Sequence, residues 1–295
     1  MNSAFLNSEK VKAEARNLGF SACGLSPAER VEESHAQRFR KWLSLGYQAE
    51  MQYMANHQDM RLHPDLLVPG VKTIVSVALP YRLPSPVPYL SMYAQGEDYH
   101  TVLRQRLSML MQAIGATGRC FVDTAPVLER YWAWRSGVGW IGKDAQLHVP
   151  QVGSAVFLGE LFVMEEADAY DQPLASSCSD CLLCRHSCPC GALTEEGLDA
   201  RRCLSYWTIE HRGPLPSDLL LRGKFYGCDR CLMACPRPVQ YTREASFSPS
   251  PALREMTWED WQQLTPERYA ELFRGSAVKR VKYEGLLRNI RAFRT

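Results

Sequence analysis

Residues 178–189 of this 295-residue chain read CSDCLLCRHSCP, and residues 228–236 read CDRCLMACP. The first stretch has the spacing Cys-x2-Cys-x2-Cys-x3-Cys-Pro, and the second repeats its last three cysteines and the proline. Nine of the eleven cysteines fall between residues 178 and 235. A secreted disulfide protein would usually spread its cysteines through a shorter chain, so this density favours metal binding.

The first run has the spacing with which bacterial ferredoxins bind 4Fe–4S clusters. In that arrangement three successive thiolates bind one cluster, and the fourth cysteine binds the other cluster. The same rule divides most cysteines of this chain into two groups. The first group is Cys178, Cys181, Cys184 and Cys235, and the second contains Cys188, Cys228 and Cys231.

The second group needs one more ligand, and two cysteines are candidates. Cys190 lies two residues beyond Cys188 and would need a tight local geometry, whereas Cys203 lies elsewhere in the chain and can approach freely. We therefore predict Cys203 as the fourth ligand, with Cys190 as the alternative. Structural zinc is another interpretation of paired Cys-x2-Cys elements, but the overlapping triple spacing that ends in Cys-Pro favours two 4Fe–4S clusters.

The first part of the chain alternates strand and helix patterns. Strands are predicted at residues 20–26, 71–81, 119–127 and 153–163, and helices at 30–56, 98–115 and 128–137. Asp98 and Gly115 have the residue types that begin and end a helix. This alternation indicates an α/β or α+β domain around one sheet. We predict three parts: this domain at 1–168, the cysteine-bearing domain at 169–242, and a helical basic segment packed on the core at 243–295.

The chain shows no sign of a membrane segment or of secretion. No apolar stretch approaches the ~20 residues that span a bilayer, and the N-terminus reads as an amphipathic helix ending near Gly19 rather than as a signal peptide. We therefore expect a cytoplasmic protein. The net charge is only +2, yet residues 272–295 carry seven Lys and Arg residues against Glu284 alone. This pattern is typical of either a polyanion-binding surface or a solvated helical face.

Four longer stretches carry a resemblance to a known family. They are SMYAQGEDYH (91–100), VDTAPVLERYWAWRSGVGWIGK (122–143), LDARRCLSYWTIEHRG (198–213) and YGCDRCLMACP (226–236). In this order they resemble the YAxGxDYH, VDTGP-x-x-ER…GxGWxGKN, LDxRRCxSYxTIExxG and second cysteine motifs of the epoxyqueuosine reductase family. The resemblance extends from about residue 10 to residue 290.

The resemblance implies a cobalamin-dependent oxidoreductase that reduces the epoxide of epoxyqueuosine in tRNA, the last step of queuosine synthesis. It implies a nitroreductase-like cobalamin-binding domain joined to a ferredoxin-like two-cluster domain, with a cluster ligand from the RRCxSY motif, which agrees with Cys203. No Asp-x-His-x-x-Gly motif is present, so we expect base-off cobalamin without a protein histidine ligand. We also expect a monomer that receives electrons from an external one-electron donor such as flavodoxin or ferredoxin.

The same resemblance assigns roles to individual residues. Asp123 is the expected acid for the departing epoxide oxygen, although the alternative is a plain strand-end turn. An aspartate is normally ionised at neutral pH, so we expect burial against the corrin to raise the pKa of Asp123. The expected cofactor contacts are Arg61, Asp123, Lys143, Ser205 and Tyr206. The expected contacts to phosphates of the tRNA anticodon arm are Lys279, Arg280, Lys282 and Arg288.

The chain departs from the family pattern in several places. Ala125 replaces a glycine, Asp144 an asparagine and Cys190 a threonine, and the C-terminus resembles a shorter form without the helical-repeat domain. Three other functions compete with the reductase. An electron carrier would bind no cobalamin, another cobalamin reductase such as a dehalogenating enzyme would need no basic tail, and an iron–sulfur nucleic-acid-binding protein would need no acid at position 123.

Overall fold

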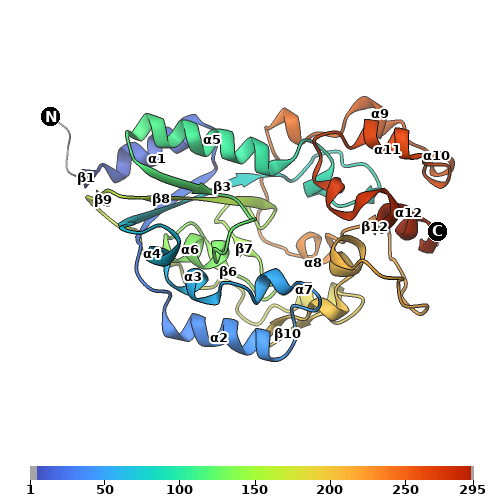
Figure 1. The fold of residues 1–295 in the computed structure, drawn as a ribbon, viewed down its shortest axis with the longest axis horizontal. Helices are drawn as coiled ribbons and strands as arrows, with labels where there is room; N and C mark the ends of the chain where they lie inside the picture. Colours follow the sequence, from blue (N-terminus) through green and yellow to red (C-terminus); the bar gives the residue numbers. More distant parts are fainter. Residues whose placement is uncertain (1–4, 294–295) are drawn as a thin grey trace.

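The computed structural model describes residues 5–293 and contains a four-stranded sheet (Figure 1). The strands, in order across the sheet, are β2 (Ala22–Pro27), β3 (Thr73–Pro80), β8 (Val156–Val163) and β5 (Gly118–Phe121). Every neighbouring pair is antiparallel. The predicted mixed fold class is confirmed, and its sheet is of the α+β kind.

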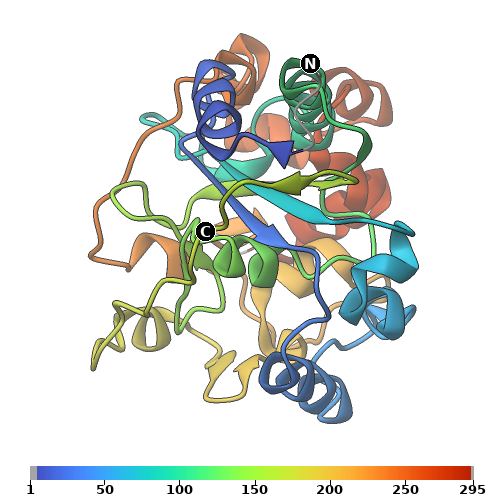
Figure 2. The same ribbon diagram turned by 90° about the vertical axis from the view of Figure 1, so that its left-hand side faces the viewer.

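Helices cover both faces of this sheet (Figures 1 and 2). α1 (Ser8–Asn17) and α5 (Tyr99–Ile114) cover one face, and α6 (Glu129–Arg135) lies on the other. Because successive side chains of a strand point to opposite faces, Val75 of β3 packs in the core beneath α1 and α5, whereas Ile74 packs with residues of α6. The sheet therefore lies between two apolar layers.

The boundaries of α5 are those that the sequence predicts. The side chain of Asp98 accepts a hydrogen bond from the backbone N–H of His100 at 3.0 Å, which caps the first turn. Gly115 ends the helix with a φ of 69°, in the left-handed region that glycine adopts without strain. The cap holds Tyr99 and His100 at the start of α5, beside the site described below.

The single helix predicted for residues 30–56 is wrong in its second half. α2 spans Glu33–Ser44, and Gly46 then takes a positive φ of 67°. A glycine in this conformation ends a helix. Two short helices follow, α3 (Gln58–Leu62) and α4 (Pro64–Leu67).

A second core lies beside the sheet domain and contains the C-terminal helices (Figure 1). Here β12 (Lys224–Tyr226) pairs with β4 (Tyr89–Leu90), so residues 87–94 pack with a part of the chain far from them in sequence. The helices are α9 (Pro251–Arg254), α10 (Trp258–Gln262), α11 (Pro266–Leu272) and α12 (Lys282–Ala292). The domain boundaries after residues 168 and 242 stay a prediction.

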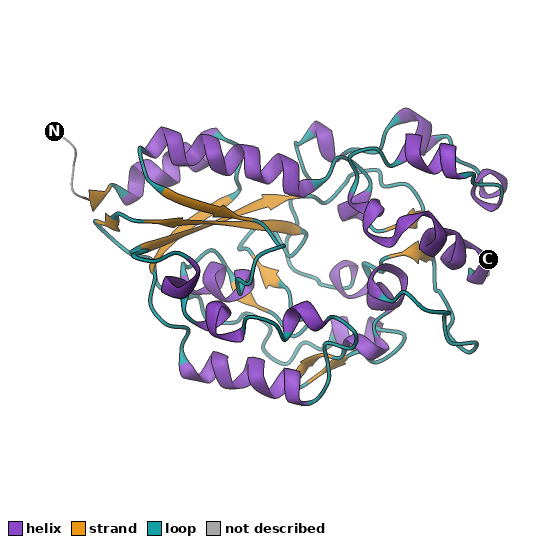
Figure 3. Cartoon of the chain, viewed as in Figure 1, coloured by secondary structure: helices purple, strands orange, loops and turns teal. Residues whose placement is uncertain are grey.

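The cysteine-bearing region has little regular structure (Figure 3). α7 (Leu183–Ser187) and α8 (Arg230–Met233) are each about one turn long and pack against each other. The strands β10 (Leu193–Thr194) and β11 (Gly197–Leu198) form a small hairpin. Packing of α7 on α8 brings the two cysteine runs together.

The remaining strands form two short pairs. β1 (Phe5–Leu6) pairs with β9 (Glu166–Ala167), and β6 (Trp140–Ile141) pairs with β7 (Leu147–His148). No helix among residues 5–293 combines the length and apolar character needed to cross a membrane.

Asn289 joins α12 to the cysteine-bearing region. Its buried amide group donates hydrogen bonds to the carbonyl oxygens of Thr208 (2.7 Å) and Phe225 (2.9 Å). Its side-chain oxygen accepts from the guanidinium of Arg288. Buried carbonyl groups need such donors, because an unpaired polar group is costly away from water.

Replacing Asn289 with alanine should lower the free energy of unfolding by about 2–4 kcal/mol, because two buried carbonyl groups lose their donor. The measurement is urea unfolding of the anaerobically prepared protein, followed by tryptophan fluorescence. Arg291 is exposed on the same helix, and Arg291→Ala should change stability by less than about 0.5 kcal/mol. Equal effects of the two substitutions would contradict the role given to Asn289.

Candidate functional site

A pocket of about 280 Å³ opens beside the sheet, where the loop after β5 meets β7 and the start of β8. Asp123, Glu129 and Arg130 supply its charged groups. Most of the wall is aromatic or aliphatic, and the ring centroids of Tyr99 and Phe157 are stacked 4.3 Å apart. The apolar and aromatic lining residues are Tyr81, Tyr93, Tyr99, Leu147, Val156, Phe157 and Leu158.

Asp123 stands at this pocket in a hydrogen-bonded group. It follows β5 with a φ of 57°, a left-handed conformation that aspartate tolerates better than most residues. Tyr99 donates its hydroxyl hydrogen to Oδ2 of Asp123 at 2.7 Å, and Nε2 of His100 lies 3.2 Å from the same oxygen. Nδ1 of His100 lies 2.6 Å from Oδ1 of Asp98. Both ring nitrogens of His100 are therefore engaged.

The expected rise in the pKa of Asp123 is not found. Burial acts to raise the pKa of Asp123, but hydrogen bonds from His100 and Tyr99 outweigh it, and the pKa is lowered. The pKa of His100 is raised to about 9, because hydrogen bonds to Asp123 and Asp98 outweigh the opposing effect of burial. At neutral pH the proton of this group is therefore on His100, hydrogen-bonded to an ionised Asp123.

Glu129 is a site residue that the sequence reasoning missed. It is the first residue of α6, and its carboxylate accepts a hydrogen bond from the backbone N–H of Asp123. The pKa of Glu129 is raised to about 7, first by burial and then by the charge of Asp123. The signal was present in the motif VDTAPVLER, whose glutamate lies six residues after the aspartate.

The thiols predicted for the first cluster lie together. The pKa of Cys184 and that of Cys235 are both raised by burial first, and both also by the charges of Cys178 and Cys181. Cys235 thus joins the first run across about fifty residues of sequence. A donor set of this kind fits one 4Fe–4S cluster.

The second predicted set also comes together. Burial is the main cause that raises the pKa of Cys228, and the charges of Cys203 and Cys188 add to it. The pKa of Cys231 is raised to about 12, first by burial and also by the charges of Cys203 and Cys228. Burial raises the pKa of Cys190, and the charges of Cys188 and Cys203 add to this effect. Cys190 therefore lies beside this set. The links from Cys203 to Cys228 and Cys231 favour Cys203 over Cys190 as the fourth ligand.

The two thiol sets are not arranged to bind a single metal ion. Among residues 5–293, no three His, Cys, Asp or Glu side chains are placed to bind a single metal ion. A cubane needs a wider arrangement, because each of its four irons takes one thiolate. The backbone N–H of Ala192 donates to Sγ of Cys188 at 3.3 Å, which stabilises a negative sulfur.

His148 links the sheet domain to the first thiol set and was also missed. This buried residue has Nε2 2.9 Å from Oδ1 of Asp144 and Nδ1 3.8 Å from Sγ of Cys235. The charge of Asp144 also raises the pKa of Cys235, after burial. The replacement of asparagine by Asp144 was the available sequence signal, but nothing local indicated that the two residues meet a cluster ligand.

The other expected cofactor contacts do not gather at the pocket. Arg61 is buried and donates to the carbonyl oxygen of Tyr53 at 2.6 Å. Lys143 donates to the carbonyl oxygen of Ser179 at 2.6 Å. Ser205 hydrogen-bonds to the thiol of Cys203. The Tyr206 hydroxyl donates to Glu50 at 3.0 Å. Only Asp123 of this predicted set lines the pocket.

The four predicted tRNA contacts divide into two kinds. Arg280 binds both carboxylate oxygens of Glu210, at 3.1 and 2.6 Å. Arg288 donates to the backbone carbonyls of Trp207, His211 and Gly213. Both arginines therefore hold the fold together. Of the four, Lys279 and Lys282 are exposed and are the side chains best placed to meet a phosphate; the contact of each of the four residues with tRNA stays a prediction.

The basic segment nevertheless lies near the pocket. The pKa of Arg280 is raised, first by its hydrogen bond to Glu210 and in smaller part by the charge of Asp123. The ring of Tyr53 stacks under the Arg280 guanidinium at 5.6 Å. A ligand that binds along this segment would therefore approach the Asp123 pocket.

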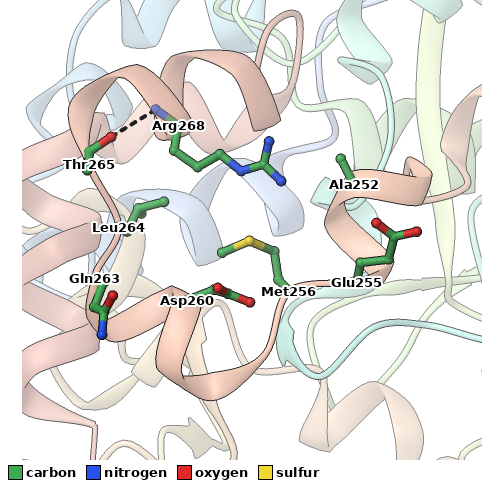
Figure 4. Close-up of a pocket in the computed structure, with 8 residues that line it drawn as sticks. All are labelled: Ala252, Glu255, Met256, Asp260, Gln263, Leu264, Thr265 and Arg268. Carbon is green, nitrogen blue, oxygen red and sulfur yellow. Dashed lines mark hydrogen bonds between the residues drawn. The ribbon is translucent and has the colours of Figure 1, made fainter.

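A second hollow, of about 440 Å³, lies among α9, α10 and α11 (Figure 4). Arg268 projects into it and pairs with Glu271 at 2.7 Å, while Glu255 and Asp260 are on the opposite wall. This mixture leaves no excess positive charge for a phosphate group. Because none of the predicted site residues lines it, we place the functional site at the Asp123 pocket.

Two family models match the chain. Residues 61–124 match "Epoxyqueuosine reductase QueG, DUF1730", and residues 177–237 match the "4Fe-4S double cluster binding domain". The epoxyqueuosine reductase of Cellulophaga algicola is 40% identical, over 98% of this chain and 99% of the relative. That of Escherichia coli K12 is 36% identical, over 96% and 79%.

Solved structures agree with the sequence comparisons. A crystal structure of epoxyqueuosine reductase with a tRNA-Tyr epoxyqueuosine-modified tRNA stem loop has a TM-score of 0.84 and 26% identity, and covers 96% of this chain and 79% of that one. The enzyme from Streptococcus thermophilus has a TM-score of 0.82 and 27% identity over the same shares.

Iron counting distinguishes the two candidate ligands of the second cluster. Cys203→Ser should lower the iron content from about eight to about four atoms per chain, because one cubane loses a thiolate. Cys190→Ser is the matched control and should leave about eight irons. The measurement is iron and sulfide content after anaerobic reconstitution, with the visible spectrum. Iron loss in Cys190→Ser alone would reverse the assignment.

Proposed function

Because the chain belongs to the epoxyqueuosine reductase family, we propose that it reduces the epoxide of epoxyqueuosine in tRNA to the alkene of queuosine. The chain is an oxidoreductase with a 4Fe–4S double cluster binding domain. One structural observation carries the proposal: a hydrogen-bonded acid group lines a pocket in the same chain that assembles two four-thiol sets. An electron carrier would have no use for that acid group.

The reaction fixes what the site must supply. Removal of the epoxide oxygen as water consumes two electrons and two protons and leaves a carbon–carbon double bond. When bound, 4Fe–4S clusters held by the two thiol sets would supply single electrons, and cobalamin would supply the cobalt chemistry that reduces the epoxide. The remaining tasks fall to protein side chains, which bind the substrate, exclude water and deliver protons to the oxygen.

The pocket suits the cofactor that the family implies. Its wall of tyrosine, phenylalanine and aliphatic side chains fits the side of a large, mostly apolar ring. Both ring nitrogens of His100 are engaged by Asp98 and Asp123, and the absence of a protein histidine ligand to cobalamin stays a prediction. A volume of about 280 Å³ is at the lower end of ligand sites. The pocket would therefore hold the reacting parts of cofactor and substrate. Arg61, Lys143, Ser205 and Tyr206 stay predicted contacts.

His100 and Asp123 act together as the first proton source. His100 carries a proton at neutral pH because it lies between two carboxylates, those of Asp98 and Asp123. Asp123 receives this proton at Oδ2 and presents it to the epoxide oxygen in the pocket. A carboxylate can do this only if a donor reloads it, and His100 is within hydrogen-bond distance at 3.2 Å.

The proposed function also includes a substrate partner, a cellular compartment and an electron donor. The substrate partner is tRNA, whose phosphates would lie along the segment that carries Lys279 and Lys282. We place the protein in the cytoplasm as a monomer that receives single electrons from a donor such as flavodoxin or ferredoxin. Leu183 of α7 and Met233 of α8 are exposed, so such a donor could contact them.

Replacing Asp123 with asparagine should reduce queuosine formation by about 10²- to 10⁴-fold, because the amide cannot pass a proton from His100 to the oxygen. The measurement is conversion of epoxyqueuosine-containing tRNA under anaerobic conditions, read by mass spectrometry of the nucleosides. Iron and cobalt content should match the parent protein. Full activity of the variant would remove Asp123 from the mechanism, and a parent protein without activity would sink the proposed function.

Substituting both Lys279 and Lys282 by alanine should weaken tRNA binding by about tenfold and reduce the slope of log K against log salt by about two, because two phosphate contacts are lost. Binding is measured by fluorescence anisotropy of a labelled anticodon stem loop at several salt concentrations. Lys10 is exposed on α1, at the far end of the molecule from α12, and Lys10→Ala is the control. An unchanged slope in the double variant would place the tRNA elsewhere.

A further inference from the structure

Glu160 is a buried acid with no role in the mechanism so far. It lies in the middle of β8 and is 0% exposed. Its register partners are Ser76 on β3 and Phe121 on β5. Among residues 5–293, no backbone N–H and no side chain other than that of Glu129 forms a hydrogen bond with its carboxyl oxygens. An ionised carboxylate buried in this way would be very costly, so Glu160 holds a proton.

Glu129 is the residue with which Glu160 shares this proton. The pKa of Glu160 is raised well above its usual range, first by burial and then by the charge of Glu129 and a hydrogen bond to it. Two carboxyl groups can form a hydrogen bond only when one of them is protonated. The two residues therefore form an acid pair that shares protons and titrates as a unit.

Several charged groups face Glu129 from the surrounding elements. The charge of Asp123 supports the raised pKa of Glu129, whereas Arg130 on α6 and His100 on α5 oppose it. Arg61 on α3 is close enough for its own pKa to respond to the charge of Glu129. Among the described residues, Glu129 is the charged group whose effect on the pKa of Glu160 is resolved.

The reaction uses two protons for one oxygen. His100 and Asp123 supply the first proton. They would have to take up another proton before they could supply the second, and bound tRNA covers the site at that stage. We infer that Glu129 and Glu160 hold the second proton, which Glu129 delivers into the pocket where Asp123 acts. In the first step one proton and one electron break one C–O bond of the epoxide and leave a hydroxyl group. In the second step Glu129 protonates that hydroxyl while the second electron from the external donor enters the substrate, so that the remaining C–O bond breaks, water leaves and the carbon–carbon double bond forms. The inference rests on the proposed function.

The geometry gives this proton a path. Glu129 and Asp123 line the same pocket, and the carboxylate of Glu129 is fixed there by the backbone N–H of Asp123. Glu160 is 0% exposed and interacts with the carboxyl group of Glu129, so Glu129 is the route by which its proton would reach the pocket. Glu160 is thus a supporting residue, and Glu129 is the group that faces the reacting oxygen.

Glu160→Gln tests the inference, because glutamine has the size of a protonated glutamate but gives up no proton. Queuosine formation is measured in a single turnover with the prereduced protein between pH 6 and pH 9. The parent should keep its rate past neutral pH, since Glu160 refills Glu129. In the variant Glu129 titrates alone near 7, so the rate at pH 8 should be about tenfold lower, while the rate at pH 6 stays within about twofold.

Ser76→Ala is the matched control, because Ser76 is buried directly opposite Glu160 on β3 and carries no titratable proton. Its pH profile should follow that of the parent. An unchanged profile in Glu160→Gln, or the same change in Ser76→Ala, would overturn the inference.

Infrared spectroscopy tests whether Glu160 is protonated, independently of whether the protein forms queuosine. The parent should show the carbonyl band of a buried protonated carboxyl group that persists at pH 8, and Glu160→Gln should lack it. This band needs no substrate, so it reports on the proton even if the parent forms no queuosine. A parent without the band would overturn the inference whatever its activity.

Discussion

Each thiol set takes cysteines from both runs, and this requirement organises the whole molecule. Cys235 must reach the first run, and Cys188 must reach the second, so α7 and α8 have to pack together. The strand that precedes Cys228 is β12, which pairs with β4 and thereby pulls residues of the first third of the chain into the second core. The segment that carries the second cysteine run is thus tied through β12 and β4 to a distant part of the chain.

The two-residue strand β7 separates the acid pocket from the first thiol set. Leu147 lines the pocket, whereas His148, the next residue, contacts Sγ of Cys235 at 3.8 Å. Successive side chains of a strand point in opposite directions, so one short strand has a side toward each centre. In the proposed reaction, electrons from the first thiol set and protons from the pocket would therefore arrive from opposite sides of the same strand. This arrangement keeps the first thiol set close to the pocket, and the buried pair of His148 and Asp144 lies beside Cys235 of that set.

The sequence predicts what depends on local pattern and fails where tertiary contacts decide. The cysteine groups and the cap of α5 at Asp98 follow from spacing and residue type, and the structure brings these groups together. Glu160 could not be found in this way, because within the run GSAVFLGELFV it reads as one polar residue of a strand. Its role depends on Glu129, thirty-one residues away in sequence. Likewise, a count of positive charges cannot distinguish Arg288, which holds backbone carbonyls, from a lysine that is free to bind phosphate.

The acids near the pocket keep protons at neutral pH by two different physical means. His100 is positively charged because two carboxylates surround it, and attraction of this kind weakens as water and salt enter the site. Glu160 is neutral because burial makes its charged form costly, and salt does not reach it. Asp123 lies between these environments and is held ionised by its donors, so it passes protons on rather than storing them. The proposed reaction protonates one oxygen twice, so two groups that hold protons by different means can supply one proton each. In the proposed reaction, His100, which is partly exposed, would be reloaded from solvent before the substrate binds, and buried Glu160 would keep its proton until the substrate covers the pocket.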